Sequence, residues 1–443
     1  SSRARRRIGG GSPGSASEMV ARAVLALVSL GVASAAPDAA REVVTVPGWP
    51  SAKGFPLSFG IKADGMVYAS GLGGLDMHTM KKAGGGVEGE TKQALVNLKE
   101  LLAAAGSSLE NVVACSVSLA DIKRDFAAMN GAYAAFFKKD PPSRVCVEVG
   151  QLAGGSLVEI KCMAALSGSH KEVVQVPGWP HIGQVPLSMV TKVNGMVYPS
   201  GMQGLDMAAR KLVPGGAGPE TTQTLANIKA ALKAAGSDLD LVLGCEVSLA
   251  RVEDFEAMNA AYAAAFGGGK GRLGGLPSRV AVKVGGLAGT GVVEIRCVAA
   301  TEELAPKVVK VPGWPKLPFP FSTATAARGM LYLSGQQGFD FKTMKLVEGG
   351  IGAETTQTLK NIDEVVRAAG GRIEDVVECE VSLKSIEDFK DMNAAYAAFW
   401  PKDPPSRIAL QVGGLVGKSS VEIKCLAAGV GMAEDGPGEE MII

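Results

Sequence analysis

Apolar residues recur in strand-like and helix-like spacings, in the same order, three times along the chain. In the first occurrence, the apolar runs 66–70 and 112–119 predict two strands. Between them, leucines at helical spacing predict a helix from Glu90 to Gly106, a residue that favours helix termination. A second helix is predicted from about Asp121, and two apolar strands follow it. This order predicts an α+β fold, with two helices on one face of a mixed sheet.

The motif Val-Pro-Gly-Trp-Pro marks the start of each occurrence, with its tryptophan at Trp49, Trp179 and Trp314. The distance between these tryptophans is much longer than the unit of a solenoid and suits one complete small domain. Short polar segments join neighbouring repeats, so we expect the repeats to pack closely. The predicted parts are domains at 42–166, 172–301 and 307–429, a targeting or disordered N-terminal segment at 1–41 and an acidic C-terminal tail at 430–443.

Several predicted strands are apolar on both sides of the pleat, including residues 112–115 and 157–160. Strands of this kind are buried on both faces of their sheet. One face receives the two helices, so the other face needs a second partner. With three copies in one chain, the other repeats can supply it, and we expect a monomer closed as an intrachain pseudo-trimer.

The composition of the 443-residue chain excludes several classes of function. Hydrophobic residues make up 47% and charged residues 20%, which predicts a packed globular protein. The net charge of +1, without a basic run in the body of the chain, argues against a dedicated nucleic-acid binder. The chain has 3 histidines and the third repeat has none, so chemistry shared by all repeats cannot use histidine as a base or metal ligand.

The 7 cysteines form no Cys-x-x-Cys pair and no ligand cluster. Six of them occupy two equivalent positions of the repeats, within apolar strands: Cys115, Cys245, Cys379, Cys162, Cys297 and Cys425. Cysteine in such a strand usually behaves as a small buried hydrophobe. The odd count and the missing bridge pattern predict free thiols in a reducing compartment.

Residues 1–41 differ from the repeats and suggest targeting. If translation starts at Met19, a short basic region, an apolar region and an Ala-x-Ala site resemble a secretory signal. Read from Ser1, the segment is rich in Arg, Ser and Ala, as organelle transit peptides are. We expect a mitochondrial or plastid location, with the cytoplasm or secretion as alternatives. The apolar run is too short to span a membrane, so no stable membrane association is expected.

A charged pair recurs at one spacing on the closing strands of every repeat. An arginine follows Pro-Ser, and a glutamate lies between Val and Ile on the next apolar strand. The pairs are Arg144 with Glu159, Arg279 with Glu294, and Arg407 with Glu422. Structural interpretations exist: a solvated strand end for the arginine, a water-facing position for the glutamate, or a cross-strand ion pair. Threefold recurrence favours a functional pair.

These motifs resemble the RidA (YjgF-type, reactive intermediate deaminase) family when they are taken with three others. The others are Ser-Gly after an early strand, Glu-Thr-x-Gln-x-Leu-x-Asn on the first helix, and Asn-x-Ala-Tyr on the second. The resemblance implies a chorismate-mutase-like fold for each repeat and clefts between repeats. It also implies hydrolysis of reactive enamines and imines, such as 2-iminobutanoate and 2-iminopropanoate, to 2-oxo acids and ammonia. It implies no metal and no organic cofactor.

Imino-acid chemistry then suggests roles for the repeated residues. An arginine fork matches a planar carboxylate, so the expected substrate anchors are Arg144, Arg279 and Arg407. A carboxylate can activate water as a general base, so the expected catalytic residues are Glu159, Glu294 and Glu422. The clefts would be lined by the pairs Ser70 and Gly71, Ser200 and Gly201, and Ser334 and Gly335. Cys146 would shape one cleft only, because Ala281 and Ala409 occupy its equivalent positions.

Other recurring residues have structural interpretations. Packing or capping is expected for Gln and Asn of the first helix, a core position for Tyr133, Tyr262 and Tyr396, and a turn with a packed indole for Val-Pro-Gly-Trp-Pro. Where the family often has a tyrosine before a serine, this chain has Leu57, Leu187 and Phe321. The repeats therefore need not be equally active.

Two other functions stay open at this point. One is a non-catalytic protein that binds 2-oxo acids or acts like a chaperone. The other is an endoribonuclease or translation inhibitor, which the near-neutral charge disfavours. The partners we expect are small imino and oxo acids, without nucleic acid.

Overall fold

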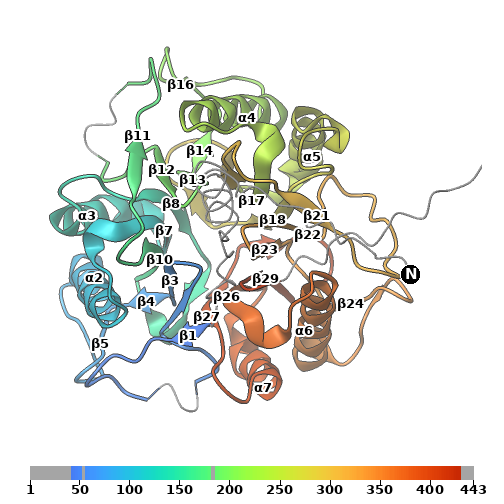
Figure 1. Cartoon of the computed structure of the whole chain (residues 1–443). Coiled ribbons are helices and arrows are strands. Elements are labelled where there is room, and N and C mark those ends of the chain that lie inside the picture. The colour runs from blue at the N-terminus through green and yellow to red at the C-terminus, as the bar shows by residue number, and fades with distance from the viewer. Residues whose placement is uncertain (1–40, 52–54, 181–184, 431–443) are drawn as a thin grey trace, which may run out of the picture. The chain divides into compact units, whose positions relative to one another are not determined.

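A computed structural model gives the architecture of residues 41–51, 55–180 and 185–430. The predicted targeting segment and acidic tail lie outside the described residues, apart from Arg41 and Val430, and stay predictions. All three repeats fall within one compact unit. Figure 1 shows them in blue to cyan, green to yellow, and orange to red, each with two helices beside its own strands.

Each repeat builds a mixed sheet with the same strand order. The first sheet contains, in spatial order, β1 (Glu42–Val43), β2 (Gly60–Ala63), β3 (Met66–Ala69), β10 (Val158–Ala165), β7 (Val112–Leu119), β8 (Ser143–Glu148) and β19 (Gly286–Leu287). The second contains β11 (Glu172–Val174), β12 (Val190–Val193), β13 (Met196–Pro199), β20 (Val293–Ala300), β17 (Val242–Leu249), β18 (Ser278–Lys283) and β28 (Gly414–Leu415). The third contains β21 (Lys307–Val309), β22 (Ala324–Ala327), β23 (Met330–Leu333), β29 (Val421–Ala427), β26 (Val376–Leu383), β27 (Ser406–Gln411) and β9 (Gln151–Leu152). In the first sheet β7 and β8 run parallel and the other neighbours antiparallel, which confirms the predicted mixed sheet.

Two helices cover one face of each sheet, as predicted (Figure 1). They are α2 (Gly86–Ala104), α3 (Ile122–Phe136), α4 (Ala217–Ala234), α5 (Phe255–Ala265), α6 (Gly350–Ala368) and α7 (Phe389–Phe399). The first helix begins earlier than predicted, because positive φ at Gly85 and Gly86 turns the chain into the helix before Glu90. Asp121 caps α3 by accepting a bond from the Arg124 N–H at 2.9 Å. Within the described ranges, no helix is both long and apolar enough to cross a membrane.

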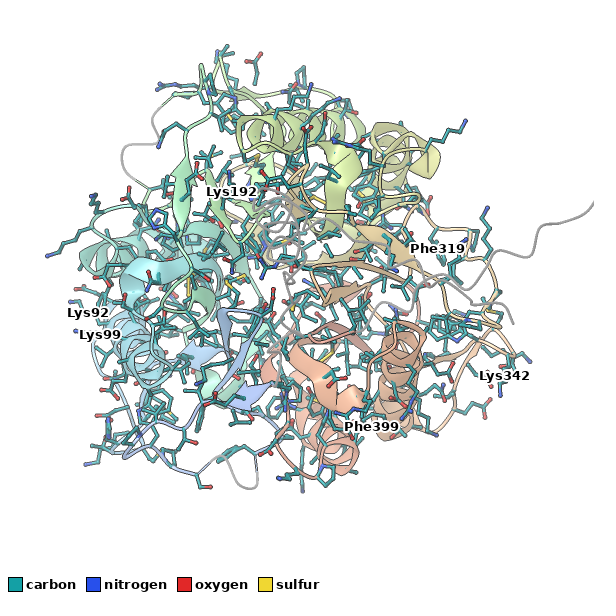
Figure 2. The ribbon with its side chains drawn as sticks, in the orientation of Figure 1. Lys92, Lys99, Lys192, Phe319, Lys342 and Phe399 are labelled. Carbon is teal, nitrogen blue, oxygen red and sulfur yellow. A yellow bond between two sulfur atoms is a disulfide. The ribbon has the colours of Figure 1, made fainter. Side chains whose placement is uncertain are left out.

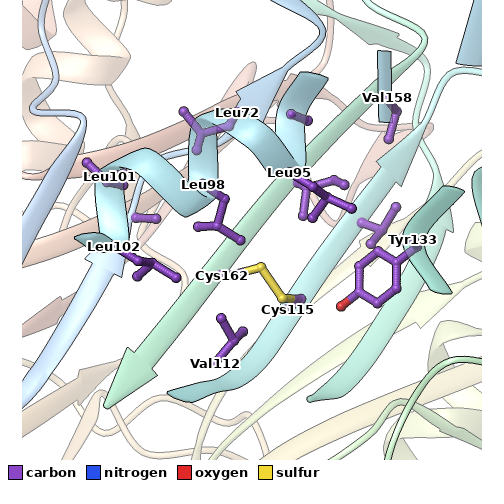
Figure 3. Close-up of a cluster of buried hydrophobic side chains, with 14 of the residues drawn as sticks. Leu72, Leu95, Leu98, Leu101, Leu102, Val112, Cys115, Tyr133, Val158 and Cys162 are labelled. Carbon is purple, nitrogen blue, oxygen red and sulfur yellow. A yellow bond between two sulfur atoms is a disulfide. The ribbon is translucent and has the colours of Figure 1, made fainter. Parts of the chain in front are cut away.

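The helices pack on the sheet through one apolar face. In the first repeat, Leu95, Leu98, Leu101 and Leu102 of α2 lie over β7 and β10, as Figure 3 shows. Burial of each leucine stabilises the fold by about 1.5–3 kcal/mol. The other face of the same helix carries lysines such as Lys92, which extends outward in Figure 2.

The opposite face of each sheet packs against the other repeats, as the two-sided apolar strands predicted. One buried cluster takes equivalent residues from all three repeats, including Val113, Leu243 and Val377, each with 0% exposure. These side chains form a shared core that no repeat could bury alone.

A cyclic exchange of short strands closes the three repeats. Strand β19 of the second repeat pairs with β8 of the first, β28 of the third pairs with β18 of the second, and β9 of the first pairs with β27 of the third. Each repeat therefore gives one strand and receives one. This exchange builds the intrachain pseudo-trimer. A monomer in solution stays a prediction.

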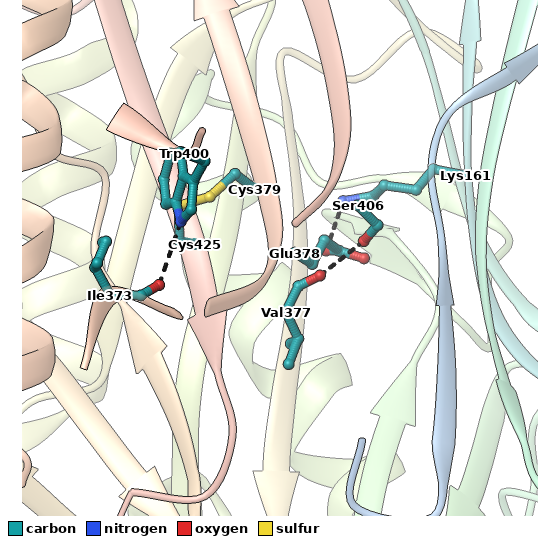
Figure 4. The surroundings of a disulfide bond; sticks show 8 residues. All are labelled: Lys161, Ile373, Val377, Glu378, Cys379, Trp400, Ser406 and Cys425. Carbon is teal, nitrogen blue, oxygen red and sulfur yellow. Dashed lines mark hydrogen bonds and ion pairs between the residues drawn. A yellow bond between two sulfur atoms is a disulfide. The ribbon is translucent and has the colours of Figure 1, made fainter. Parts of the chain in front are cut away.

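Buried ion pairs link the repeats where the three sheets meet. Lys161 of the first repeat donates to Glu378 of the third at 2.9 Å, as Figure 4 shows. Glu246 of the second repeat binds both Arg296 of its own repeat and Lys424 of the third. Every cation in this group therefore has a carboxylate partner, as buried charges require.

The prediction of free thiols at the six equivalent cysteines is wrong. Three disulfides link β7 to β10 and the matching strands of the other repeats: Cys115–Cys162, Cys245–Cys297 and Cys379–Cys425. The two cysteines of each bond are direct partners in the antiparallel register, with Cα atoms 4.1–4.2 Å apart. The argument from unpaired cysteines for a reducing compartment therefore falls. Cys146 is the free cysteine of the described residues.

Thiol counting tests this correction. In denaturant without reductant, we expect one reactive thiol per chain, from Cys146, and seven after reduction. Reduction should lower the melting temperature, because each cross-link contributes roughly 2–4 kcal/mol. Seven thiols before reduction would contradict the three bridges. A Cys146→Ser variant is the control and should have none before reduction.

Candidate functional site

The three predicted arginines lie near the start of β8, β18 and β27, where each strand docks onto another repeat. The Arg144 N–H donates to Ser200 Oγ at 2.8 Å, and the Gly201 N–H donates back to the Arg144 carbonyl at 3.1 Å. The same two bonds join Arg279 to Ser334 and Gly335, and Arg407 to Ser70 and Gly71. We call these places junction 1/2 (Arg144), junction 2/3 (Arg279) and junction 3/1 (Arg407).

The glutamate at each junction comes from the repeat that supplies Ser-Gly. A Cβ atom built at Gly201 would overlap the Glu294 carboxylate, so only glycine leaves room for it. The same overlap occurs between Gly335 and Glu422 and between Gly71 and Glu159. Each arginine acts electrostatically on the glutamate of its own junction: Arg144 on Glu294, Arg279 on Glu422 and Arg407 on Glu159.

The arginine and glutamate of one repeat do not meet. Strand β7 lies between β8 and β10, and it pairs with Arg144 on one side and with Glu159 on the other. The interpretation as a cross-strand ion pair is therefore wrong. A solvated strand end is also wrong for the arginines, because Arg144, Arg279 and Arg407 are 3–4% exposed.

The buried guanidinium groups lack a carboxylate partner. Among the described residues, no salt bridge reaches Arg144, and its Nε and Nη1 have no hydrogen-bond acceptor. Its charge lies instead over the ring of Tyr133, 4.9 Å from the centroid. Arg279 and Arg407 make the same contact with Tyr262 and Tyr396. A buried cation with free donors is an arrangement suited to a small anion.

The three carboxyl groups are held partly protonated near neutral pH. Burial raises the pKa of Glu159, Glu294 and Glu422 to about 7, because a low-dielectric site penalises the charged form. The arginine of each junction opposes this shift but does not cancel it. A group with this pKa can both take and return a proton at neutral pH.

The predicted Ser-Gly pairs lie at the junctions, but their polar groups are occupied. Ser200 Oγ accepts from Arg144 and donates to the Ser188 carbonyl at 2.7 Å. The Gly201 N–H is bound to the Arg144 carbonyl. These groups join the repeats, and direct contact with a substrate stays a prediction for them.

Cys146 lies at junction 1/2, near the charges of Arg144 and Glu294. Its side chain is buried, and burial raises the pKa of the thiol to about 12. A thiol with this pKa is not ionised at neutral pH, so this site does not activate Cys146 as a nucleophile.

Sequence reasoning missed two features of the junctions. The second-helix tyrosines are buried as predicted, but their stacking on the arginines was not foreseen. The other feature is Gln203, whose side chain donates to Glu294 Oε2 at 2.9 Å. The available signal for Gln203 was its place two residues after the Ser-Gly motif. By contrast, Asn97 binds the Leu75 carbonyl at 2.7 Å, which confirms its predicted structural role.

A surface groove of about 810 Å³ lies beside junction 3/1. It is lined by residues 43–51 and 55–59 of the first repeat and by residues 397 and 400–404 of the third. Ser58 crosses from one wall to the other through a bond to the Pro404 carbonyl at 2.6 Å. Two smaller cavities, of about 90 and 60 Å³, lie where the three sheets meet. No group of three or more metal-ligating side chains occurs in the part of the chain that the structure describes.

Comparison with known proteins shows the family that the sequence of this chain matches. The family model described as Endoribonuclease L-PSP matches residues 51–166, 183–301 and 315–429. The chain is 41% identical over 124 residues to 2-iminobutanoate/2-iminopropanoate deaminase of Mus musculus, and the match covers 28% of this chain and 90% of the relative. It is 40% identical over 120 residues to RutC family protein UK114 of Drosophila melanogaster, covering 27% of this chain and 86% of the relative.

Solved structures also match part of this chain. RidA from the Antarctic bacterium Psychrobacter is 35% identical over 27% of this chain and 98% of its own, with a TM-score of 0.26. TdcF from E. coli with bound serine is 29% identical over 28% of this chain and 99% of its own, with a TM-score of 0.27.

The raised pKa values make folding stability depend on pH. Between the ordinary glutamate pKa of 4.5 and about 7, the folded protein holds protons that the unfolded chain releases. Stability therefore falls as pH rises through this window. In the Glu159/Glu294/Glu422→Gln variant, we expect a gain in melting temperature over the unmodified protein that is larger at pH 8 than at pH 5.

The matched control for this measurement carries the same three changes at exposed positions, Glu253, Glu256 and Glu303. Calorimetry of both variants at both pH values gives the comparison. An equal gain at pH 5 and pH 8 would show that the junction carboxyls are not held protonated.

Proposed function

The chain belongs to the Endoribonuclease L-PSP (RidA) family, whose model matches it three times, and from this premise we propose that it hydrolyses small 2-imino acids to 2-oxo acids and ammonia. Relatives in the family carry the name 2-iminobutanoate/2-iminopropanoate deaminase, which supports enamine and imine deamination as the general activity. The observation that carries the proposal is a buried guanidinium with free donors beside a carboxyl group whose pKa is about 7.

The arginine is the proposed anchor of the substrate carboxylate. A carboxylate accepts charge-assisted hydrogen bonds from a guanidinium, and Nε and Nη1 of Arg144 have no acceptor among the described residues. The tyrosine ring behind the guanidinium keeps it from turning away without neutralising its charge. The charge therefore stays available for an anionic ligand.

The glutamate is the proposed proton carrier. In the ionised state it takes a proton from water while the water oxygen bonds to the imine carbon, and it passes this proton to the imine nitrogen, which gives a carbinolamine. The glutamate then takes the proton of the carbinolamine hydroxyl group and passes it to the amino group. The C–N bond breaks, and ammonia leaves as the carbonyl forms. The balance is one imino acid and one water to one 2-oxo acid and one ammonia. One carboxyl group can serve both steps because its pKa of about 7 lies near the operating pH.

A binding protein without catalysis is the second candidate. The unpaired guanidinium suits a 2-oxo acid as well as an imino acid, since both present the same carboxylate. Tight binding of pyruvate without hydrolysis above the spontaneous rate would favour this candidate over the enzyme.

Removal of the three anchors tests the proposed function. We expect the Arg144/Arg279/Arg407→Ala variant to lose about 100-fold or more in kcat/KM, because the charge-assisted hydrogen bonds to the substrate carboxylate disappear at each junction. The assay is ammonia and 2-oxo acid release from an imino acid that a dehydratase generates in situ.

Arg367→Ala is the control, because Arg367 is exposed on α6. Circular dichroism and melting curves establish that each variant is folded. Unchanged activity in a folded triple variant would overturn the assignment of the anchors.

A further inference from the structure

The residue that faces the junction glutamate differs between repeats. In the second repeat, Gln203 of β14 (Met202–Gln203) is the direct strand partner of Glu294 on β20. In the first repeat, Gly73 of β4 (Leu72–Gly73) is the partner of Glu159. In the third, Gln337 occupies this position, next to the bridge between Gln336 and Ile423. One backbone position therefore carries Gln twice and Gly once.

The amide of Gln203 is fixed by three contacts. Its Nε2 donates to the Ala288 carbonyl at 2.7 Å and to Glu294 Oε2 at 2.9 Å. Its Oε1 accepts from the Gly291 N–H at 3.2 Å. The backbone of the loop from Ala288 to Gly291 therefore fixes the direction of the Gln203 amide. The amide in turn orients one oxygen of Glu294. The other oxygen, Oε1, lies against Gly201.

The third repeat keeps part of this arrangement and the first repeat lacks it. Gln337 Nε2 donates to the Val416 carbonyl at 2.9 Å, the loop position equivalent to Ala288. Burial raises the pKa of Glu422 and the nearby Gln337 opposes this shift, but Glu422 Oε2 has no hydrogen-bond partner among the described residues. Gly73 has no side chain to do this, and no hydrogen bond to the Glu159 carboxylate occurs among the described residues. The glutamine contact is therefore complete at junction 1/2, partial at junction 2/3 and missing at junction 3/1.

We propose that Gln203 is a positioning residue that holds the glutamate of junction 1/2 in the orientation for proton transfer, and that junction 3/1 is a weaker site because Gly73 occupies the equivalent position. This inference rests on the proposed function. A carboxylate fixed at one oxygen presents the same oxygen to water in every turnover. A carboxylate without this contact spends part of its time in other orientations, which lowers the rate of proton transfer.

Loss of the glutamine contact should lower kcat and leave KM unchanged, because the arginine anchors the substrate and the glutamate does not. Variants with one intact arginine isolate the junctions. Arg279/Arg407→Ala leaves junction 1/2, and Arg144/Arg279→Ala leaves junction 3/1.

In the protein with junction 1/2 alone, we expect Gln203→Leu to lower kcat about tenfold with KM unchanged. The ascending limb of the pH–rate profile should also move to higher pH, because the lost bond favoured the ionised glutamate. In the protein with junction 3/1 alone, Gly73→Gln with Ser156→Gly recreates the Gln203 and Gly291 pair of the second repeat. We expect this variant to raise kcat about tenfold.

Gln175→Leu is the matched control, because Gln175 is exposed and distant in sequence from the junction motifs. It should leave kcat and the pH profile unchanged. A variant that only loses folded protein keeps the ascending limb of its pH–rate profile at the same pH. A shift of this limb therefore distinguishes a positioning role from a general structural role. A Gln203→Leu variant with unchanged kcat and an unchanged limb would overturn the proposal.

Carbon NMR of the glutamate side chains in the full chain gives a readout that needs no activity. The Glu294 carboxyl signal is assigned by its loss in Glu294→Gln, and its pKa should rise in Gln203→Leu. If the unmodified protein does not hydrolyse imino acids, the proposed function fails. The titration then still decides whether Gln203 holds Glu294. An equal Glu294 pKa in the unmodified protein and in Gln203→Leu would contradict the positioning role of Gln203.

Discussion

The bond between the arginine backbone and the Ser-Gly of another repeat is the contact on which the rest of the site depends. It brings the start of β8 against the second repeat, so that Arg144 reaches Glu294. The glycine beside it is also the place where the carboxylate rests. One short contact therefore joins two repeats beside the strand exchange and brings the charged groups together, so neither repeat alone holds both charged groups of a junction.

The two sets of buried charges differ in whether each cation has a carboxylate partner. Where the three sheets meet, Lys161, Arg296 and Lys424 each have a carboxylate partner. These pairs offset the cost of burial and link the repeats. At the junctions, by contrast, Arg144 lies over an aromatic ring with free donors, and the Glu294 pKa is raised. Unpaired buried charge costs stability, and a site that binds an anion and moves a proton gives a reason to retain it.

The sequence allowed the repeats, their helices, the mixed sheet and the shared second face to be predicted, because all follow from hydrophobic period and length. It also singled out the arginines and glutamates that the structure brings together at the junctions, and their roles stay predictions. It could not show which arginine lies near which glutamate, because the spacing between the two is the same in every repeat. Only the order of strands in the sheet shows that β7 separates the arginine and glutamate of one repeat. The disulfides were missed for a related reason. Cys115 and Cys162 are far apart in sequence, and only the β7 and β10 register makes them neighbours. Gln203 was missed because a single glutamine on a short strand has no periodic signal.

The central claim is that each site joins two repeats, and one pair of variants tests it most directly. Starting from Glu159→Gln with Glu422→Gln, Glu294 is the one junction glutamate left. Addition of Arg144→Ala should then abolish imino-acid hydrolysis, and addition of Arg279→Ala should leave it unchanged. Loss of activity with Arg279→Ala and its retention with Arg144→Ala would show that arginine and glutamate act within one repeat and would contradict the account.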